Sequence, residues 1–189
     1  MTAEATLPAT GHKHGRGRHV VVGLSGGVDS ALSAWRLLQA GYQVSGLFMV
    51  NWTEDEAAYC TAAEDFQSAR GVCQELSIPL HRVDFSAEYQ QSVFHRFVEE
   101  YAAGKTPNPD VLCNREVKFG PFIDHARRLG ADAIATGHYA RLEQRADGPH
   151  LMRAADDNKD QTYFLATVDR QRFENVLFPI GDLSKPQVR

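Results

Sequence analysis

The feature that most constrains the fold is an apolar run that leads through a glycine-rich turn into a helix. Residues 19–24 (HVVVGL) form a short apolar run, which is typical of a buried strand. Residues 30–40 repeat apolar side chains with the period of a helix, and Gly41 stands where a helix commonly ends. This order predicts that residues 25–30 join the carboxyl end of a buried strand to the start of a helix.

The alternation of strands and helices continues along the chain. Further strands are expected at 44–50, 80–85 and 133–136, and helices at 61–76, 87–103 and 116–129. The order β-α-β-α-β-α-α-β predicts an α/β fold, an open parallel sheet with helices on both faces. Ligands bind such sheets beyond the carboxyl ends of the strands, so the candidate binding loops are 25–30, 49–52 and 137–139. After Arg145 the pattern weakens, and no convincing final element is expected.

The charge of the chain is modest but uneven. The net charge is −4, yet residues 51–100 carry ten acidic and three basic side chains, whereas residues 103–153 carry eight basic and six acidic ones. Any polyanion is therefore expected to approach the second half. Residues 1–18 lack a hydrophobic block and are rich in Gly, His and Arg, which predicts a disordered tail rather than a secretory signal. No apolar run approaches the roughly 20 residues of a membrane span, so no membrane partner is expected.

The three cysteines, Cys60, Cys73 and Cys113, are widely spaced. Their spacing matches neither a zinc site nor a disulfide framework. This usage fits a reducing compartment, and we expect a cytoplasmic protein.

The turn between the first strand and helix has the composition of an anion-binding loop. Gly26 and Gly27 allow successive backbone N–H groups to face one anion, and the helix N-terminus adds its positive end. Ser25 and Ser30 offer hydroxyl donors, and Asp29 can hold the Mg²⁺ that accompanies a phosphate. The string lacks the Gly-Lys-Ser/Thr ending of a Walker loop and the third glycine of a dinucleotide fold. The alternative is an ordinary glycine-rich turn with Asp29 or Ser30 as the helix N-cap.

A second informative stretch, residues 106–119 (TPNPDVLCNREVKF), contains a cysteine in a proline-rich polar loop. A helix is expected to begin near Asn114 or Arg115, just after Cys113. A thiol at a helix N-terminus near basic side chains is expected to have a depressed pKa. The alternative is a buried structural cysteine. Cys73 fits that alternative because it lies on the apolar face of the helix expected at 61–76.

Residues 25–30 (SGGVDS) resemble the PP-loop of the N-type ATP pyrophosphatases, a superfamily that cleaves ATP between the α- and β-phosphates. From residue 19 to residue 189 the chain closely resembles the tRNA-specific 2-thiouridylase family. The strings that carry this resemblance are 48–52 (FMVNW), 59–63 (YCTAA), 106–119, 135–139 (ATGHY), 158–164 (NKDQTYF) and 178–181 (FPIG). The resemblance implies a Rossmann-like domain of the adenine nucleotide alpha hydrolase type, and conversion of a wobble uridine of tRNA to 2-thiouridine.

The resemblance also implies a role for individual residues. The expected ATP-binding residues are Gly23, Leu24, Ser25, Gly26, Gly27, Val28, Asp29, Ser30, Met49 and Gly137. Asn108, Pro109 and Asp110 are expected to surround the target base, with Cys113 as a catalytic cysteine and Asp110 as its acid/base partner. Lys159, Asp160 and Gln161 are expected to contact the tRNA, although composition alone favours a solvated loop there.

The resemblance implies partners and parts beyond those in this sequence. The cofactors are ATP and Mg²⁺, and the partners are the tRNA anticodon loop and a protein that donates persulfide sulfur. The family uses a second cysteine and later RNA-binding and β-barrel domains, which would follow Arg189. We therefore expect residues 1–18 to be a tail and residues 19–189 to be an incomplete PP-loop catalytic domain that binds ATP without completing sulfur transfer.

Two other functions use the same loop. One is a small-molecule adenylating ligase or amidotransferase, which has no use for Cys113. The other is a nucleotide-binding or tRNA-binding module without catalysis.

Overall fold

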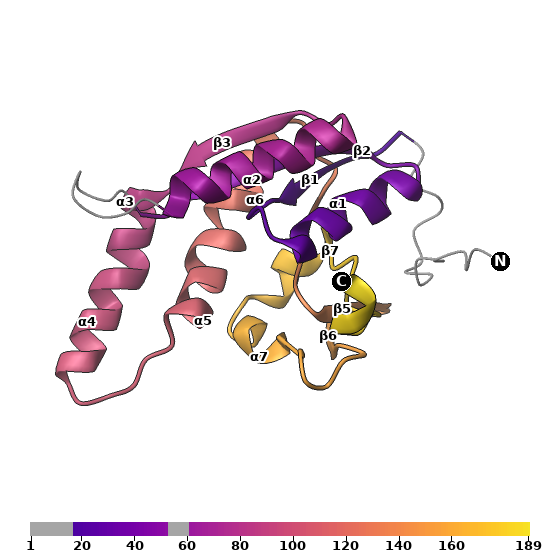
Figure 1. Cartoon of the computed structure of the whole chain (residues 1–189). Coiled ribbons are helices and arrows are strands. Elements are labelled where there is room, and N and C mark those ends of the chain that lie inside the picture. The colour runs from indigo at the N-terminus through magenta and orange to yellow at the C-terminus, as the bar shows by residue number, and fades with distance from the viewer. Residues whose placement is uncertain (1–16, 53–60) are drawn as a thin grey trace.

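The computed structural model describes residues 17–52 and 61–189, and it has a five-stranded parallel sheet at its centre (Figure 1). The strands are β1 (His19–Gly23), β2 (Gln43–Val50), β3 (Leu80–Asp84), β4 (Ala133–Ala135) and β7 (Val176–Leu177), in the order β3-β2-β1-β4-β7. All four pairings are parallel. The predicted α/β class is confirmed. Cys60 and most of the predicted tail lie outside the described residues.

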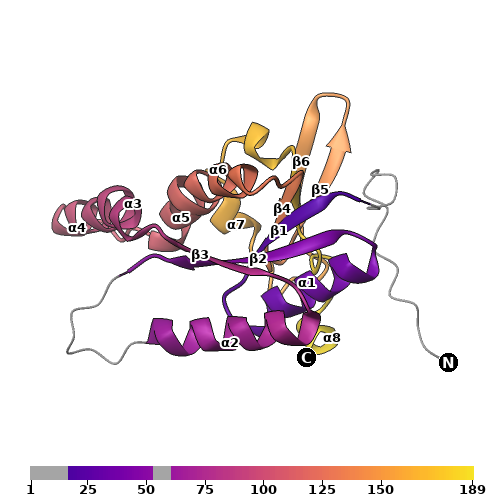
Figure 2. The same cartoon turned by 90° about the horizontal axis from the view of Figure 1, so that it is seen from above.

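Helices cover both faces of the sheet because alternate side chains of its strands point to opposite sides. Val20 and Val22 of β1 lie in one core cluster with residues of α1 (Val28–Gln39) and α2 (Thr61–Leu76). Val21 lies in a second cluster with residues of α6 (Pro121–Arg128). Seen from above, α1 and α2 lie on one side of the sheet and α6 on the other (Figure 2).

The predicted helix at 87–103 forms, but its middle is wound differently. It consists of α3 (Ser86–Tyr89), a π-helical turn η1 (Gln90–Phe94) and α4 (His95–Ala102). α4 runs beside α5 (Pro109–Cys113) and away from the sheet (Figure 1). The loop that joins α4 to α5 therefore lies at the end of these helices that is farthest from the sheet (Figure 1).

The predicted helix at 116–129 is wrong in its start and in its continuity. The helix starts at Pro109 and continues as a π-helical turn, η2 (Asn114–Lys118). The helix is interrupted at Gly120, and a new helix, α6, follows. Asn108 causes the early start, because its side chain accepts the N–H groups of Asp110 and Val111. Proline at the first position of both helices fits the same geometry.

The last third of the chain contains elements that the sequence pattern did not predict. An antiparallel hairpin, β5 (Ala140–Arg145) and β6 (Gly148–Arg153), is followed by α7 (Thr162–Leu165), the 3-10 turn η3 (Arg170–Phe173) and α8 (Lys185–Val188). These elements are short and carry little periodicity. Among the described residues, no helix is long and apolar enough to cross a membrane.

A bidentate ion pair fastens the end of the chain to α1. Arg36 is 3% exposed, and its two terminal nitrogens donate to the carboxylate oxygens of Asp182 at 2.7 and 3.0 Å. Asp182 is the one counter-ion of Arg36 in the described part of the chain, and a buried guanidinium that loses its counter-ion retains its full desolvation cost. This pair is therefore important for holding residues 181–189 against the sheet domain.

Replacing Asp182 by Ala is expected to lower the free energy of unfolding by about 3 kcal/mol, because it leaves Arg36 buried without a partner. Urea denaturation measures this. The matched control is Asp124→Ala, which removes exposed ion pairs with Arg127 and Arg172 and should cost less than about 1 kcal/mol. The double change Arg36→Met with Asp182→Leu should recover most of the loss. Equal costs for the two aspartates would contradict the role assigned to this pair.

Candidate nucleotide site and cysteine loop

The predicted phosphate loop lies at the carboxyl end of β1 and leads into α1. Gly27 is the N-cap residue of α1, and no side chain caps the helix. The alternative in which Asp29 or Ser30 serves as the N-cap is therefore wrong. Ser25, Gly27 and Val28 are exposed. The N–H groups in the first turn of a helix have no partners within the helix. In α1 this turn starts at the protein surface, where a ligand can reach it.

Hydrogen bonds of the Ser25 and Ser30 hydroxyl groups tie the two ends of the loop together. Ser30 is buried, and its Oγ donates to the carbonyl oxygen of Gly27 at 2.9 Å and accepts the N–H of Ser25 at 3.3 Å. The N–H of Gly27 lies 3.4 Å from Ser25 Oγ. These contacts link both ends of the loop without using any residue outside it.

Gly26 has no room for a side chain. Its φ is +82°, and a Cβ there would lie 2.7 Å from the backbone oxygen of Asp65 and 2.8 Å from Cβ of Ser68. The loop therefore packs directly against α2. Gly27 differs, since a Cβ there would meet only Ser25 Oγ, at 3.5 Å.

The segment after β4 contacts the phosphate loop directly. A Cβ on Gly137 would lie 2.9 Å from both the carbonyl carbon of Asp29 and the nitrogen of Ser30. Two residues later, the hydroxyl of Tyr139 donates to Asp29 Oδ1 at 2.9 Å. Burial and this hydrogen bond raise the pKa of Tyr139, so it remains a donor. The structure thus brings Gly137 to the loop, whereas Met49, half-buried on β2, packs against the core on the α6 side.

Asp29 has a second partner that the sequence reasoning missed. The ammonium group of Lys185 lies 2.6 Å from Asp29 Oδ1 and 2.8 Å from Oδ2. Lys185 follows Asp29 by 156 residues, and no local pattern links the two. Both carboxylate oxygens of the predicted metal ligand are thus engaged by the protein. Among residues 17–52 and 61–189, no group of three His, Cys, Asp or Glu side chains could hold a metal.

Cys113 lies in a different environment from the one predicted. It is the last residue of α5 rather than the residue before a helix, and it is 7% exposed. Burial raises the pKa of its thiol; Lys118 opposes this shift, and Asp110 adds to it. The expectation of a depressed pKa is therefore wrong. Cys73 is buried on the apolar face of α2, and burial raises its pKa to about 11. This agrees with the prediction that Cys73 is a buried structural cysteine.

The residues expected around the target base do lie near Cys113. Asn108 and Asp110 are exposed at the start of α5, one turn before the cysteine. Tyr89 packs against the core cluster that contains Cys113, and its pKa is raised by burial and further by Cys113 and Asp110. Asn114 is buried, and its Nδ2 donates to the carbonyl oxygen of Asp110, whereas its Oδ1 has no partner within residues 17–52 and 61–189. A buried thiol and an unpaired acceptor are thus adjacent in the chain.

The loop expected to contact tRNA is partly occupied by internal hydrogen bonds. Asp160 accepts the N–H of Ala154 and the hydroxyl of Thr162. Gln161 accepts the N–H of Tyr139 through its side chain and donates its own N–H to the carbonyl of Tyr139. Lys159 is exposed. Gln161 therefore supports the tyrosine that contacts Asp29.

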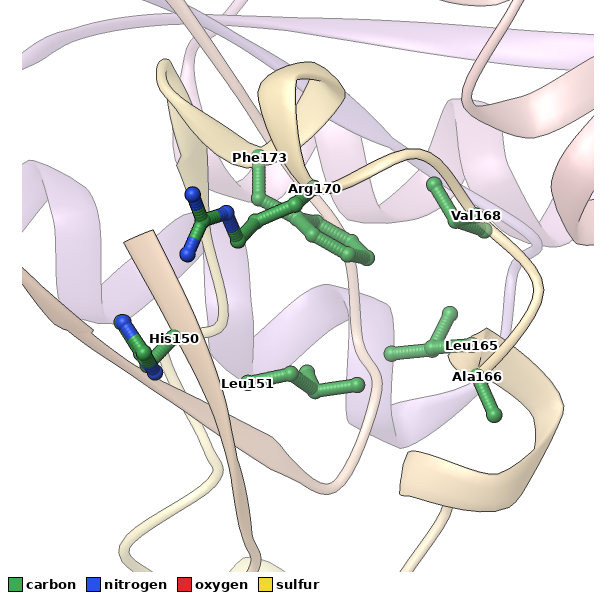
Figure 3. A pocket seen from close by; sticks show the side chains of 7 residues that line it. All are labelled: His150, Leu151, Leu165, Ala166, Val168, Arg170 and Phe173. Carbon is green, nitrogen blue, oxygen red and sulfur yellow. The ribbon is translucent and has the colours of Figure 1, made fainter. Parts of the chain in front are cut away.

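A cavity of about 230 Å³ lies elsewhere, between β6, α7 and η3 (Figure 3). Apolar side chains such as Leu151, Leu165 and Phe173 line it together with His150 and Arg170. None of the predicted site residues belongs to its lining. It is separate from both the phosphate loop and the cysteine loop.

The thiol of Cys113 is expected to react slowly with iodoacetamide at neutral pH, because burial disfavours its thiolate. Mass spectrometry of the alkylated peptides over a pH series gives its apparent pKa. We expect a value above about 8.5, the ordinary value for a thiol. The Asp110→Asn variant should lower this pKa and Lys118→Met should raise it, with Cys73 as the unchanged internal control. An apparent pKa below about 8.5 in the unmodified chain would contradict the buried environment.

Comparison with known proteins identifies the family. A family model described as tRNA methyl transferase HUP domain matches residues 18–189. The tRNA-specific 2-thiouridylase MnmA of Pseudomonas aeruginosa (strain UCBPP-PA14) is 55% identical over 175 residues, which are 92% of this chain and 47% of that protein. MnmA of Alcanivorax borkumensis is 57% identical over 171 residues, 90% of this chain and 47% of that protein. The chain thus spans about half the length of the curated relatives it matches.

Solved structures with low sequence identity share the fold. The U34-tRNA thiolase NcsA from Methanococcus maripaludis is 18% identical, with a TM-score of 0.58 over 93% of this chain and 55% of that one. A 4-thiouridine synthetase solved with RNA and bound ATP is 17% identical, with a TM-score of 0.54 over 91% of this chain and 39% of that one. From residue 18 to the last residue, this chain belongs to the tRNA methyl transferase HUP domain family.

Proposed function

We propose that this domain binds ATP at the phosphate loop and adenylates a uridine of tRNA as the first half of a 2-thiolation reaction. The observation that carries the proposal is the open loop at the carboxyl end of β1, where Ser25 and Gly27 are exposed in front of the first turn of α1. A helix N-terminus of this kind attracts phosphate. The names of the 2-thiouridylase relatives support the choice of a tRNA uridine as the second substrate.

The proposed nucleotide site uses the residues expected from the sequence. Residues 23–30 would bind the phosphates, and Gly137 would border the nucleotide; the role of Met49, which packs against the core on the α6 side, rests on the resemblance alone. Mg²⁺ would accompany ATP and offset the charge of the leaving pyrophosphate. Asp29 fits this ion, because Mg²⁺ in proteins commonly takes one or two carboxylates together with substrate phosphates. Its oxygens now bind Lys185, so Asp29 can accept a metal ion only after Lys185 has moved.

The proposed chemistry has two stages. First, the uridine O2 bonds to the α-phosphorus of ATP, pyrophosphate leaves, and the N3 proton of the uridine is released to solvent. A persulfide on the second cysteine that the resemblance implies, loaded by the donor protein, then displaces AMP from C2, and the Cys113 thiolate attacks the sulfur atom of that carrier cysteine. That attack breaks the sulfur–sulfur bond, leaving 2-thiouridine and a disulfide. Asp110 lies one turn before Cys113 and raises its pKa, which suits a group that exchanges a proton with the thiol.

The proposed partners follow from this chemistry. The anticodon loop is single-stranded, so its base can be turned into a pocket beside Asn108, Pro109 and Asp110. Lys159 is exposed, so it can contact the phosphates of the tRNA backbone. Asp160 and Gln161 form hydrogen bonds that fix the loop on which Lys159 lies. The buried free thiols of Cys73 and Cys113 agree with the proposed cytoplasmic location.

Replacing Gly27 by Val is expected to weaken ATP binding at least tenfold. The loop has room for the side chain in the free protein, so the fold should persist while the valine fills the phosphate position. Isothermal calorimetry with MgATP measures the affinity, and thermal unfolding checks the fold. The matched control is Gly104→Asn, at an exposed positive-φ position far from this loop. Unchanged ATP affinity in a folded Gly27→Val protein would remove the phosphate-loop assignment.

The chain should catalyse exchange of labelled pyrophosphate into ATP only when a tRNA with a wobble uridine is present. This exchange reports reversible adenylation before any sulfur is transferred. The control is the same tRNA with cytidine at the wobble position, and Cys113→Ser should leave exchange intact. Exchange that requires a small molecule instead of tRNA would favour the ligase alternative. ATP binding without any exchange would favour a non-catalytic module.

A further inference from the structure

The phosphate loop lacks a positive side chain of its own. Residues 23–30 contain one acidic residue, Asp29, and no lysine or arginine. Without a metal ion, a polyphosphate would therefore meet a carboxylate at the start of α1, offset within the loop only by the helix dipole, which equals about half an elementary charge. A cation from another segment is needed for strong binding.

Lys185 is placed to supply that charge. Among the described residues, it is the one cation with an ion pair to the loop, and its ammonium contacts both oxygens of Asp29 at 2.6 and 2.8 Å. The ring of Tyr139 lies 5.7 Å from the same nitrogen, and its hydroxyl donates to Asp29. The carboxylate and the aromatic ring thus fix the ammonium beside the first turn of α1.

The ammonium is not what holds α8 in place. The N–H of Lys185 donates to Asp156, and Ser184 and Gln187 form a capping box. Val188 is buried in a cluster with Tyr139 and Ile180. The backbone and apolar contacts therefore fix α8 without the Lys185 charge, and a partly exposed ion pair adds little stability.

The pair is also accessible to a ligand. The side chains of Lys185 and Asp29 are 20% and 34% exposed, beside the exposed residues of the loop. An incoming phosphate can therefore exchange with the carboxylate as the partner of the ammonium without unfolding α8. A lysine side chain is long and flexible enough for this exchange.

We propose that Lys185 binds the polyphosphate of the nucleotide directly, and that Asp29 and Tyr139 are the residues that position it. The proposal rests on the ATP site proposed above. In the free protein the ammonium neutralises Asp29. In the complex it contacts a phosphate oxygen beyond the α-phosphate, which leaves the Asp29 carboxylate free for Mg²⁺.

Calorimetry with ATP, pyrophosphate and AMP tests this assignment in wild type, Lys185→Met and Lys185→Arg. We expect Lys185→Met to weaken ATP and pyrophosphate at least tenfold and to change AMP less than twofold, while Lys185→Arg retains part of the affinity. The matched control, Lys105→Met, removes an exposed charge from the loop after α4 and should change nothing. Equal losses for AMP and ATP would indicate a structural role and overturn the proposal, as would unchanged ATP affinity.

A second arm separates direct contact from charge balance. In Mg²⁺-free buffer, pyrophosphate binding is compared between Lys185→Met and the double variant Asp29→Asn with Lys185→Met. Continued weak binding by the double variant supports a direct contact, whereas recovery to the wild-type affinity would show that Lys185 only offsets Asp29 and would overturn the proposal. Wild-type protein that binds neither ATP nor pyrophosphate would overturn the ATP site as well.

Discussion

The close contact between Gly137 and the start of α1 is the constraint on which the candidate nucleotide site depends. The backbone after β4 passes so near Asp29 and Ser30 that no Cβ fits at residue 137. That approach brings Tyr139 within hydrogen-bonding distance of Asp29. Tyr139 in turn packs with Val188 of α8, the helix that carries Lys185. A side chain at residue 137 would separate the loop from all of these groups.

The sequence predicted the elements whose side chains follow a simple period. The predicted and observed bounds of the helix at 61–76 are the same, and the strand at 44–50 differs from β2 by one residue. Gly41 has φ +84° and follows the C-cap of α1, as expected. These predictions succeed because burial against a parallel sheet requires long apolar runs in strands and an apolar stripe on helices.

The partners of Asp29 could not be predicted in this way. Tyr139 and Lys185 follow it by 110 and 156 residues, and neither lies on a periodic pattern. The prediction for the cysteine loop, residues 106–119, was wrong for a local reason instead. Asn108 caps a helix that starts several residues earlier than predicted. Cys113 therefore lies in the core and not at the positive end of a helix, where it was expected. The shift in the helix start reverses the predicted direction of its pKa change.

Asp29, the proposed metal ligand, and Cys113, the proposed catalytic thiol, are both blocked in the free protein. Asp29 is paired with Lys185, and the thiol of Cys113 is covered and held protonated by burial. A phosphate can compete for Lys185 because the pair is open to solvent. A base that enters beside Cys113, as proposed, would displace the covering side chains and would meet Asn114 Oδ1, which has no hydrogen-bond partner among the described residues. In the proposed reaction the uridine N3–H would donate a hydrogen bond to this oxygen, so entry of the base would satisfy a buried acceptor and uncover the thiol. In the proposed reaction, therefore, ATP would bind once Lys185 exchanges the Asp29 carboxylate for a phosphate, whereas the thiol would become reactive only after the base has entered.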